Sequence, residues 1–227
     1  MSKRDEMRVK RAQRQKNQRI LIITGISLAA VVIVAVFILT GFKAPVGDFV
    51  KIKAQPRPLA QGFSMGDPNA PVKVEEYGDF QCPACRIFQE SQETQLIDKY
   101  IKTGTVYFTF IPFSFIGDES VKAAEAAYCA ADQGKFWDYH DILYANQTAE
   151  NKGDFTDSRL VAFADYLNFD MAKFNNCFDA RTYKKQVTDD YAKAQHNQVD
   201  RTPSFIVNGQ LVFSNTLFQA IEQAAQP

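Results

Sequence analysis

The chain has 227 residues, of which 46% are hydrophobic and 23% are charged, so it can hold one folded domain of ordinary size together with accessory segments. Its formal net charge is zero, but the charges are unevenly placed: residues 1–19 carry eight Lys/Arg against two Asp/Glu, and the rest of the chain carries 18 against 24. Because the basic excess lies entirely in the N-terminal tail, we expect no nucleic-acid partner for the acidic body.

Residues 20–42 form an uncharged run rich in Ile, Val, Leu and Ala. As a helix it would cover about 30–35 Å, enough to cross the hydrocarbon core of a bilayer. The Lys/Arg excess before it predicts a cytoplasmic tail at residues 1–19 and export of the rest across the cytoplasmic membrane. A cleaved signal peptide is disfavoured by the length of the run and by the lack of a clear A-x-A site, and a buried core helix by the adjacent basic residues. We therefore predict a single-pass membrane anchor.

Residues 43–61 contain three prolines and little periodicity, which predicts an extended linker. A dense cluster of turn residues follows at 66–71. The alternating apolar and polar residues 72–77 then predict the first strand of the folded domain.

Cys82-Pro83-Ala84-Cys85 lies between this strand and a predicted helix over about 83–102. A C-x-x-C at a strand-to-helix junction is typical of a thioredoxin-like dithiol. The first sulfur falls at the helix N-terminus, where unpaired backbone N–H groups and the helix dipole favour a thiolate. C-x-x-C is also half of a zinc site, but no second C-x-x-C and no H-x-x-x-H follows, so we predict no metal.

The remaining elements complete the same type of fold. Residues 105–111 are rich in β-branched and aromatic residues and predict a second strand, and about 118–198 predicts a block of helices. Two short strands joined by Asn208-Gly209 predict a hairpin, and a last helix follows it. We predict an α/β thioredoxin fold with an inserted helical subdomain at about 118–198, preceded by one transmembrane helix.

Four segments carry a more specific signal: 66–72 (GDPNAPV), 79–85 (DFQCPAC), 134–141 (GKFWDYHD) and 202–209 (TPSFIVNG). In sequence and in order they resemble the DsbA-like thiol–disulfide oxidoreductases of bacteria. The resemblance covers roughly residues 62–225, so we expect residues 62–227 to form a DsbA-like domain outside the cytoplasmic membrane.

The resemblance implies a protein disulfide oxidoreductase that oxidises cysteine pairs of exported proteins without a cofactor and is reoxidised by a membrane redox partner. Cys82 would be the nucleophile and Cys85 the resolving thiol of a redox-active disulfide. A low pKa of the Cys82 thiol would make that disulfide more oxidising. The Pro-Ala between the cysteines departs from the Pro-His of the best-known oxidases and loses a side chain that could stabilise the thiolate.

Two other functions stay open on the sequence alone. One is a reductase or isomerase of exported proteins, which would run the same dithiol in another direction. The other is a non-catalytic binding module with a thioredoxin fold, which would use the groove beside Pro203 without turnover.

Glu76 shares a strand face with two valines and lies six residues before the first cysteine. A carboxylate on an apolar strand face is costly unless it is paired or protonated. The resemblance implies an acid beneath the dithiol that exchanges protons with Cys85, so we predict a catalytic role for Glu76. A strand-end residue that reaches solvent is the alternative, and a register shift of one residue would place Glu75 inside instead.

Thr202-Pro203 matches a Thr-Pro turn which, by the same resemblance, has a cis proline facing the dithiol. This turn would bind an extended substrate segment through the backbone of Thr202. An ordinary loop proline is the alternative.

Cys129 and Cys177 lie on predicted helices of the inserted block. Some relatives staple this block with a second disulfide, so the resemblance implies a structural Cys129–Cys177 bridge, with two buried free thiols as the alternative. We expect His140 and Trp137 to be interior residues without a catalytic role.

Overall fold

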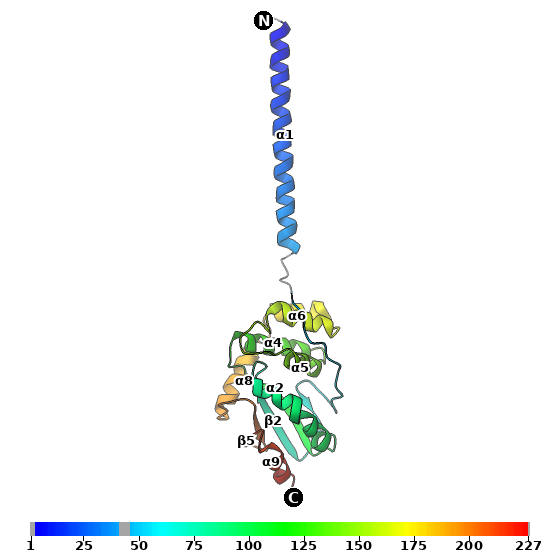
Figure 1. Cartoon of the computed structure of the whole chain (residues 1–227), viewed down its shortest axis with the longest axis vertical. Helices are drawn as coiled ribbons and strands as arrows, with labels where there is room; N and C mark the ends of the chain where they lie inside the picture. Colours follow the sequence, from blue (N-terminus) through cyan, green and yellow to red (C-terminus); the bar gives the residue numbers. More distant parts are fainter. Residues whose placement is uncertain (1–2, 41–45, 227) are drawn as a thin grey trace. The chain divides into compact units, whose positions relative to one another are not determined.

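The computed structural model describes the backbone of residues 3–40 and 46–226 and the side chains of residues 13–34 and 46–226 (Figure 1). The chain divides into two units, Met1–Pro45 and Val46–Pro227. The first contains one long helix, α1 (Lys3–Thr40), which includes most of the basic tail as well as the apolar run. Its segment Gln13–Val34 is long and apolar enough to cross a membrane. Residues 41–42 of the predicted span lie outside the described residues.

The second unit is built on a five-stranded sheet with the order β1-β3-β2-β4-β5. The central strand β2 runs parallel to β3 and antiparallel to β4. The edge strands β1 and β5 are antiparallel to β3 and β4 respectively. The strands are β1 (Ser64–Met65), β2 (Val72–Gly78), β3 (Val106–Pro112), β4 (Ser204–Val207) and β5 (Gln210–Phe213).

The predicted hairpin is confirmed. Asn208 and Gly209 join β4 to β5 with φ angles of 46° and 90°, the left-handed backbone that a type I′ turn requires. The Asn208 side chain also accepts a hydrogen bond from the backbone N–H of Lys73 at 2.7 Å, which ties the turn to β2. Helix α9 (Leu217–Ala224) follows the hairpin.

The helix that follows the dithiol is continuous from Pro83 to Ile101 but is not regular. It contains α2 (Pro83–Phe88), a π-helical turn η1 (Gln89–Glu93), α3 (Thr94–Leu96) and a second π-helical turn η2 (Ile97–Ile101). Each π-helical turn changes which residues face the sheet. Phe88 packs on Phe205 of β4 with ring centroids 4.7 Å apart, which holds the start of this helix on the sheet.

Five helices form the inserted block, which is grouped beside the sheet in Figure 1. Helix α4 is its centre and contacts α5, α6, α7 and α8. The predicted thioredoxin fold with a helical insertion is therefore confirmed. The helices are α4 (Asp118–Ala131), α5 (Phe136–Ala145), α6 (Asp157–Tyr166), α7 (Met171–Asp179) and α8 (Lys184–His196).

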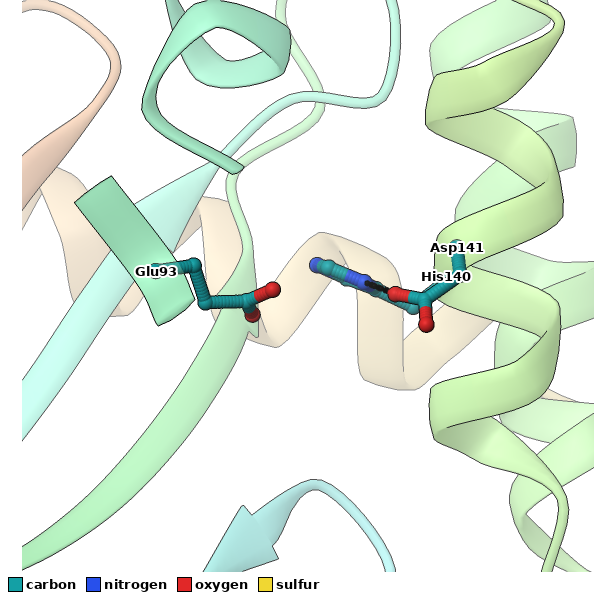
Figure 2. Close-up of side chains that lie close together, drawn as sticks. All are labelled: Glu93, His140 and Asp141. Carbon is teal, nitrogen blue, oxygen red and sulfur yellow. Dashed lines mark hydrogen bonds and ion pairs between the residues drawn. The ribbon is translucent and has the colours of Figure 1, made fainter. Parts of the chain in front are cut away.

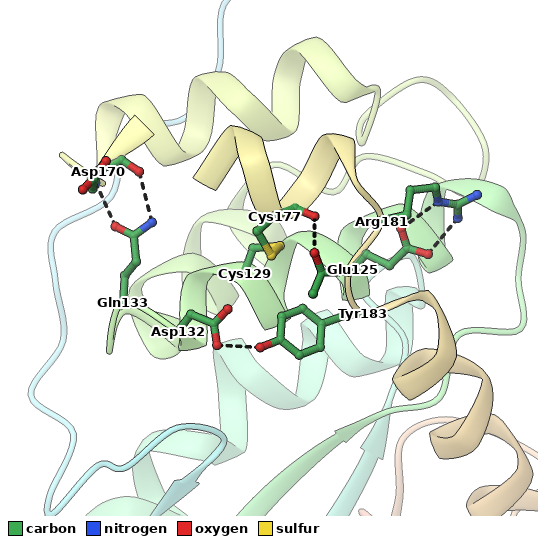
Figure 3. The surroundings of a disulfide bond; sticks show 9 residues. Glu125, Cys129, Asp132, Gln133, Asp170, Cys177, Arg181 and Tyr183 are labelled. Carbon is green, nitrogen blue, oxygen red and sulfur yellow. Dashed lines mark hydrogen bonds and ion pairs between the residues drawn. A yellow bond between two sulfur atoms is a disulfide. The ribbon is translucent and has the colours of Figure 1, made fainter. Parts of the chain in front are cut away.

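A disulfide between Cys129 of α4 and Cys177 of α7 joins two helices of this block (Figure 3). Ion pairs and hydrogen bonds surround it. Arg181 donates two hydrogen bonds to the buried carboxylate of Glu125, at 2.9 and 2.7 Å, and the Tyr183 hydroxyl lies 2.6 Å from a carboxylate oxygen of Asp132. Both pairs connect α4 to the chain that follows α7.

Residues 46–61 of the predicted linker 43–61 belong to the folded unit, and residues 43–45 lie outside the described residues. Asn146 of α5 makes two hydrogen bonds with the backbone of Val50, at 2.7 and 2.9 Å, and the Tyr166 hydroxyl donates to the carbonyl of Ile52 at 2.8 Å. Phe49 packs edge-on against Phe163. These partners lie about a hundred residues further along the chain, so local sequence gives no sign of them.

Candidate active site

Cys82 is the N-cap residue of α2, with extended backbone, and Pro83 occupies the first helical turn. Proline is favoured there because its missing N–H would have no partner inside the helix. The Cys82 side chain is buried, with 8% of its surface exposed, and its Sγ lies 3.3 Å from the carbonyl oxygen of Thr202. The start of the dithiol helix and the turn before β4 therefore meet at this sulfur.

The two thiols are both free and differ in electrostatic environment. A hydrogen bond from Cys85, the Thr202 hydroxyl, and the N–H groups of Cys85 and Ala84 outweigh burial and lower the pKa of Cys82 to about 6. Burial raises the pKa of Cys85 well above its usual value, and the hydrogen bond to Cys82 acts in the same direction. A pKa of about 6 favours the thiolate of Cys82 at neutral pH, and the raised pKa of Cys85 favours its thiol, as an attacking group and a resolving group require.

The peptide bond between Thr202 and Pro203 is cis, and both residues are buried. Apart from Cys82, the Thr202 hydroxyl has no hydrogen-bond partner within the described part of the chain, so it is free to donate to a Cys82 thiolate. β4 begins directly after Pro203 and pairs with β2, which brings the turn to the end of the sheet where the dithiol lies.

Glu76 lies on the buried face of β2, with 2% of its surface exposed, between Phe110 of β3 and Phe205 of β4. Burial, followed by the charges of Glu93 and Cys82, raises its pKa well above the usual range, whereas Arg57 acts in the opposite direction. Glu75 lies on the other face and pairs with Lys193 at 2.9 Å. The alternative register with Glu75 inside is therefore wrong.

Asp79 is a site residue that the sequence analysis missed. It is fully buried, and its carboxylate accepts hydrogen bonds from the backbone N–H groups of Gln81, Phe115 and Ile116, at 2.8, 3.0 and 3.1 Å. Its carbonyl accepts from the N–H of Cys82 at 2.9 Å. Asp79 thus fixes the loop before the first cysteine against the loop that follows β3. The sequence feature that could have identified Asp79 is an acidic residue three positions before the first cysteine.

A second missed group is a buried polar cluster of Arg57, Glu93, His140 and Asp141. Arg57 pairs with Glu93 at 3.0 Å and with Asp141 at 2.5 Å, and His140 Nδ1 lies 2.9 Å from Asp141. Figure 2 shows the His140 ring between the carboxylates of Glu93 and Asp141. His140 is interior, as expected, but it is part of a charged network.

Three of these residues, Glu93, His140 and Asp141, have potential ligand atoms within 4.8 Å of one another. The Arg57 guanidinium pairs with both carboxylates, so the charge balance of the cluster is met by a side chain of the protein and does not require a cation. Trp137 lies beneath the same guanidinium, 5.1 Å from it.

The fold and the site define a class. A thioredoxin-type sheet carries a C-x-x-C dithiol at a helix N-terminus beside a cis Thr-Pro turn, and a helical block is inserted into the fold. This is the architecture of a DsbA-type thiol–disulfide oxidoreductase.

Comparisons with known proteins identify the family. Residues 60–225 match the family model described as Thioredoxin. The chain is 35% identical over 166 residues to the probable disulfide bond formation protein D of Bacillus cereus, covering 71% of this chain and 76% of that protein. It is 27% identical to the disulfide bond formation protein D of Bacillus subtilis, with 71% and 74% covered. The crystal structure of oxidised BdbD from Bacillus subtilis superposes with a TM-score of 0.68 at 25% identity, covering 75% of this chain and 97% of that one. The chain therefore belongs to the DsbA-like disulfide bond formation proteins of the thioredoxin family, and it is a thiol–disulfide oxidoreductase.

Proposed function

We propose that this protein oxidises cysteine pairs of exported proteins, with Cys82 as the nucleophile and leaving group and Cys85 as the second sulfur of its redox-active disulfide. The observation that carries the proposal is the environment of Cys82 at the start of α2, which lowers its pKa to about 6. A stabilised thiolate favours the reduced dithiol over the disulfide, so the disulfide is more oxidising than one formed by cysteines with an ordinary pKa.

The exchange proceeds in two steps. A client thiolate attacks Sγ of Cys82, the Cys82–Cys85 bond breaks, and Cys85 leaves with the bonding electron pair. We assign to Glu76 the proton that Cys85 then takes up, because burial in an apolar site raises the pKa of this carboxyl group and favours its protonated form. A second client thiolate attacks the client sulfur of the mixed disulfide and releases Cys82 as a thiolate. The client loses two electrons and the dithiol gains them.

We assign client binding to Thr202 and Pro203. The Thr202 carbonyl lies beside the reactive sulfur, so a client segment that runs along this turn has its own cysteine next to Cys82. Pairing of an extended client backbone with the edge of the turn would position clients without selecting their side chains.

We further propose that the apolar segment of α1 is a retained anchor, with residues 1–19 in the cytoplasm and residues 46–227 outside the cytoplasmic membrane. The support is the 22-residue helical segment Gln13–Val34, which is apolar enough to cross a membrane, together with the excess of Lys and Arg in residues 1–19. Reoxidation of the dithiol requires a two-electron acceptor, which we assign to a membrane redox partner. Recovery of the protein at its full-length mass in the membrane fraction is the expected result, and a shorter soluble form would indicate a cleaved signal peptide.

The test of the oxidising function is equilibration of the full-length chain, in detergent micelles, against mixtures of reduced and oxidised glutathione. We expect a potential between that of thioredoxin, about −270 mV, and that of DsbA, about −120 mV, because the Cys82 pKa of about 6 lies between the cysteine pKa values of those two proteins, about 7 and about 3.5. Cys82→Ser is expected to abolish oxidation of a dithiol peptide. A strongly reducing potential would instead select a reductase or isomerase.

A further inference from the structure

The π-helical turn η1 directs the side chain of Glu93 toward the protein interior. Phe88 and Glu93 both face inward although they are five residues apart, whereas a regular helix would repeat a face after three or four residues. A Glu at the end of this turn is thereby buried, with 4% of its side chain exposed. π-helical turns inside α-helices occur frequently at functional sites.

The cation that pairs with Glu93 comes from a different part of the chain. Arg57 precedes the first strand, within the segment that the sequence predicts as linker, and its side chain is 6% exposed. It pairs with Glu93 on one side and with Asp141 on the other, and it lies over the Trp137 ring. Burying a guanidinium costs several kcal/mol unless it is paired. The two ion pairs of Arg57 offset this cost, and its burial points to a role beyond stability.

A groove of about 350 Å³ connects this ion pair to solvent. Residues 55–57 form one wall, and the outer face of the dithiol helix forms the other, with Glu93 and Arg57 among the lining residues. Arg57 Nε is closed off from solvent and makes no hydrogen bond within the described part of the chain. Glu93 lines the groove, so its carboxylate is the group through which the cluster can exchange protons with solvent without passing the dithiol.

The groups whose charges influence the pKa of Glu76 or are influenced by its charge come from four elements. Cys82 caps α2 and Cys85 lies in it, Glu93 belongs to η1, Arg57 to the segment before the sheet, and Tyr144 to α5. Its neighbours on β3 and β4 are Phe110 and Phe205, which carry no charge. Arg57 is the cation of this set, and Glu93 is the acid that repels an ionised Glu76.

We propose that Arg57 and Glu93 are positioning residues that set how readily Glu76 gives up its proton during thiol–disulfide exchange. The inference rests on the proposed function. When Glu76 passes its proton to the Cys85 sulfur, a carboxylate is left in an apolar site beside Glu93. Arg57 stabilises that carboxylate, and a proton from the groove then restores the acid.

The test follows the protonation of Glu76 in the reduced, full-length chain in micelles. The carboxyl C=O band of Glu76 is titrated by infrared spectroscopy and assigned as the band that Glu76→Gln removes. Arg57→Met removes the charge and keeps the length of the side chain. Arg57→Lys is the matched control that keeps the charge, and Glu93→Gln removes the repelling acid.

We expect opposite shifts. The midpoint should move up by about one pH unit in Arg57→Met and down by a similar amount in Glu93→Gln, because each removes one charge near Glu76. Arg57→Lys should lie between Arg57→Met and the wild type. The high-pH limb of the rate of peptide oxidation should move with each midpoint.

Midpoints that stay at the wild-type value, or that move in the same direction in both variants, would overturn the proposal. A purely structural role would lower the urea midpoint and leave the Glu76 titration in place. If Arg57→Met does not fold, Glu93→Gln decides alone: a lower midpoint supports the proposal and an unchanged one overturns it. Failure of the proposed function gives a different result: the wild-type chain would not oxidise a peptide, but the Glu76 titration could still be measured and compared between variants.

Discussion

The Sγ atom of Cys82 lies 3.3 Å from the carbonyl oxygen of Thr202, which is 120 residues further along the chain. The first belongs to the start of the dithiol helix and the second to the turn that leads into β4. Since β2 and β4 are neighbours in the sheet, the strand pairing itself brings the reactive sulfur to the turn.

Thr202→Val should raise the pKa of Cys82, because valine keeps the shape of threonine and removes the hydroxyl that stabilises the thiolate. A hydrogen bond to a charged group contributes about 1.5–3 kcal/mol, so we expect the pKa of Cys82 to rise by about one to two units. The rate of alkylation of the reduced protein as a function of pH measures it. Thr216→Val, at an exposed position before α9, is the matched control and should leave the profile at about 6. Equal profiles for both variants would remove the hydroxyl from the account of the thiolate.

Glu76 should make the reduced protein less stable as the pH rises. Its pKa is raised in the folded state, so above about pH 4.3 the unfolded chain has lost a proton that the folded chain still holds. The folded state binds more protons, and the free energy of unfolding therefore falls by up to about 1.4 kcal/mol per pH unit until the folded-state pKa is passed.

Glu76→Gln should lack this slope. Urea unfolding between pH 5 and pH 8, followed by fluorescence of Trp137, the single tryptophan of the chain, measures the difference between variant and wild type. Glu75→Gln on the opposite face of β2 is the control and should keep the wild-type slope. Parallel wild-type and Glu76→Gln curves would show that Glu76 does not hold an extra proton.

Loss of the Cys129–Cys177 disulfide should destabilise the helical block without disabling the dithiol. For a sequence separation of 48 residues the chain-entropy model gives about 4 kcal/mol as an upper value. In the Cys129→Ala, Cys177→Ala variant we expect a lower midpoint in urea and an unchanged pH profile of Cys82 alkylation. A change in that profile would mean that the bridge acts on the active site and not on stability alone.

Several features could be predicted because they depend on near neighbours in the chain. The C-x-x-C between a strand and a helix indicated the dithiol, and period-two alternation placed Glu76 on the inner face of β2. Asn208-Gly209 indicated a hairpin because these residues tolerate the left-handed backbone that its turn needs. The class of enzyme followed from these patterns and from their order.

The buried charges were decided by the tertiary structure. Helical periodicity cannot place Glu93, because one π-helical turn shifts the buried face by a residue. Arg57 lies in a proline-containing segment without periodicity, and its partner Asp141 is 84 residues away.

The amino-acid sequence by itself therefore determined the fold class, the two reactive sulfurs and the acid on the strand before them, since each follows from local backbone preference. Only the folded structure decided which charges surround that acid. Electrostatic interactions act through space between residues that are distant in sequence. Arg57, the cation that pairs with Glu93, comes from a segment whose sequence has no periodicity that would predict its burial.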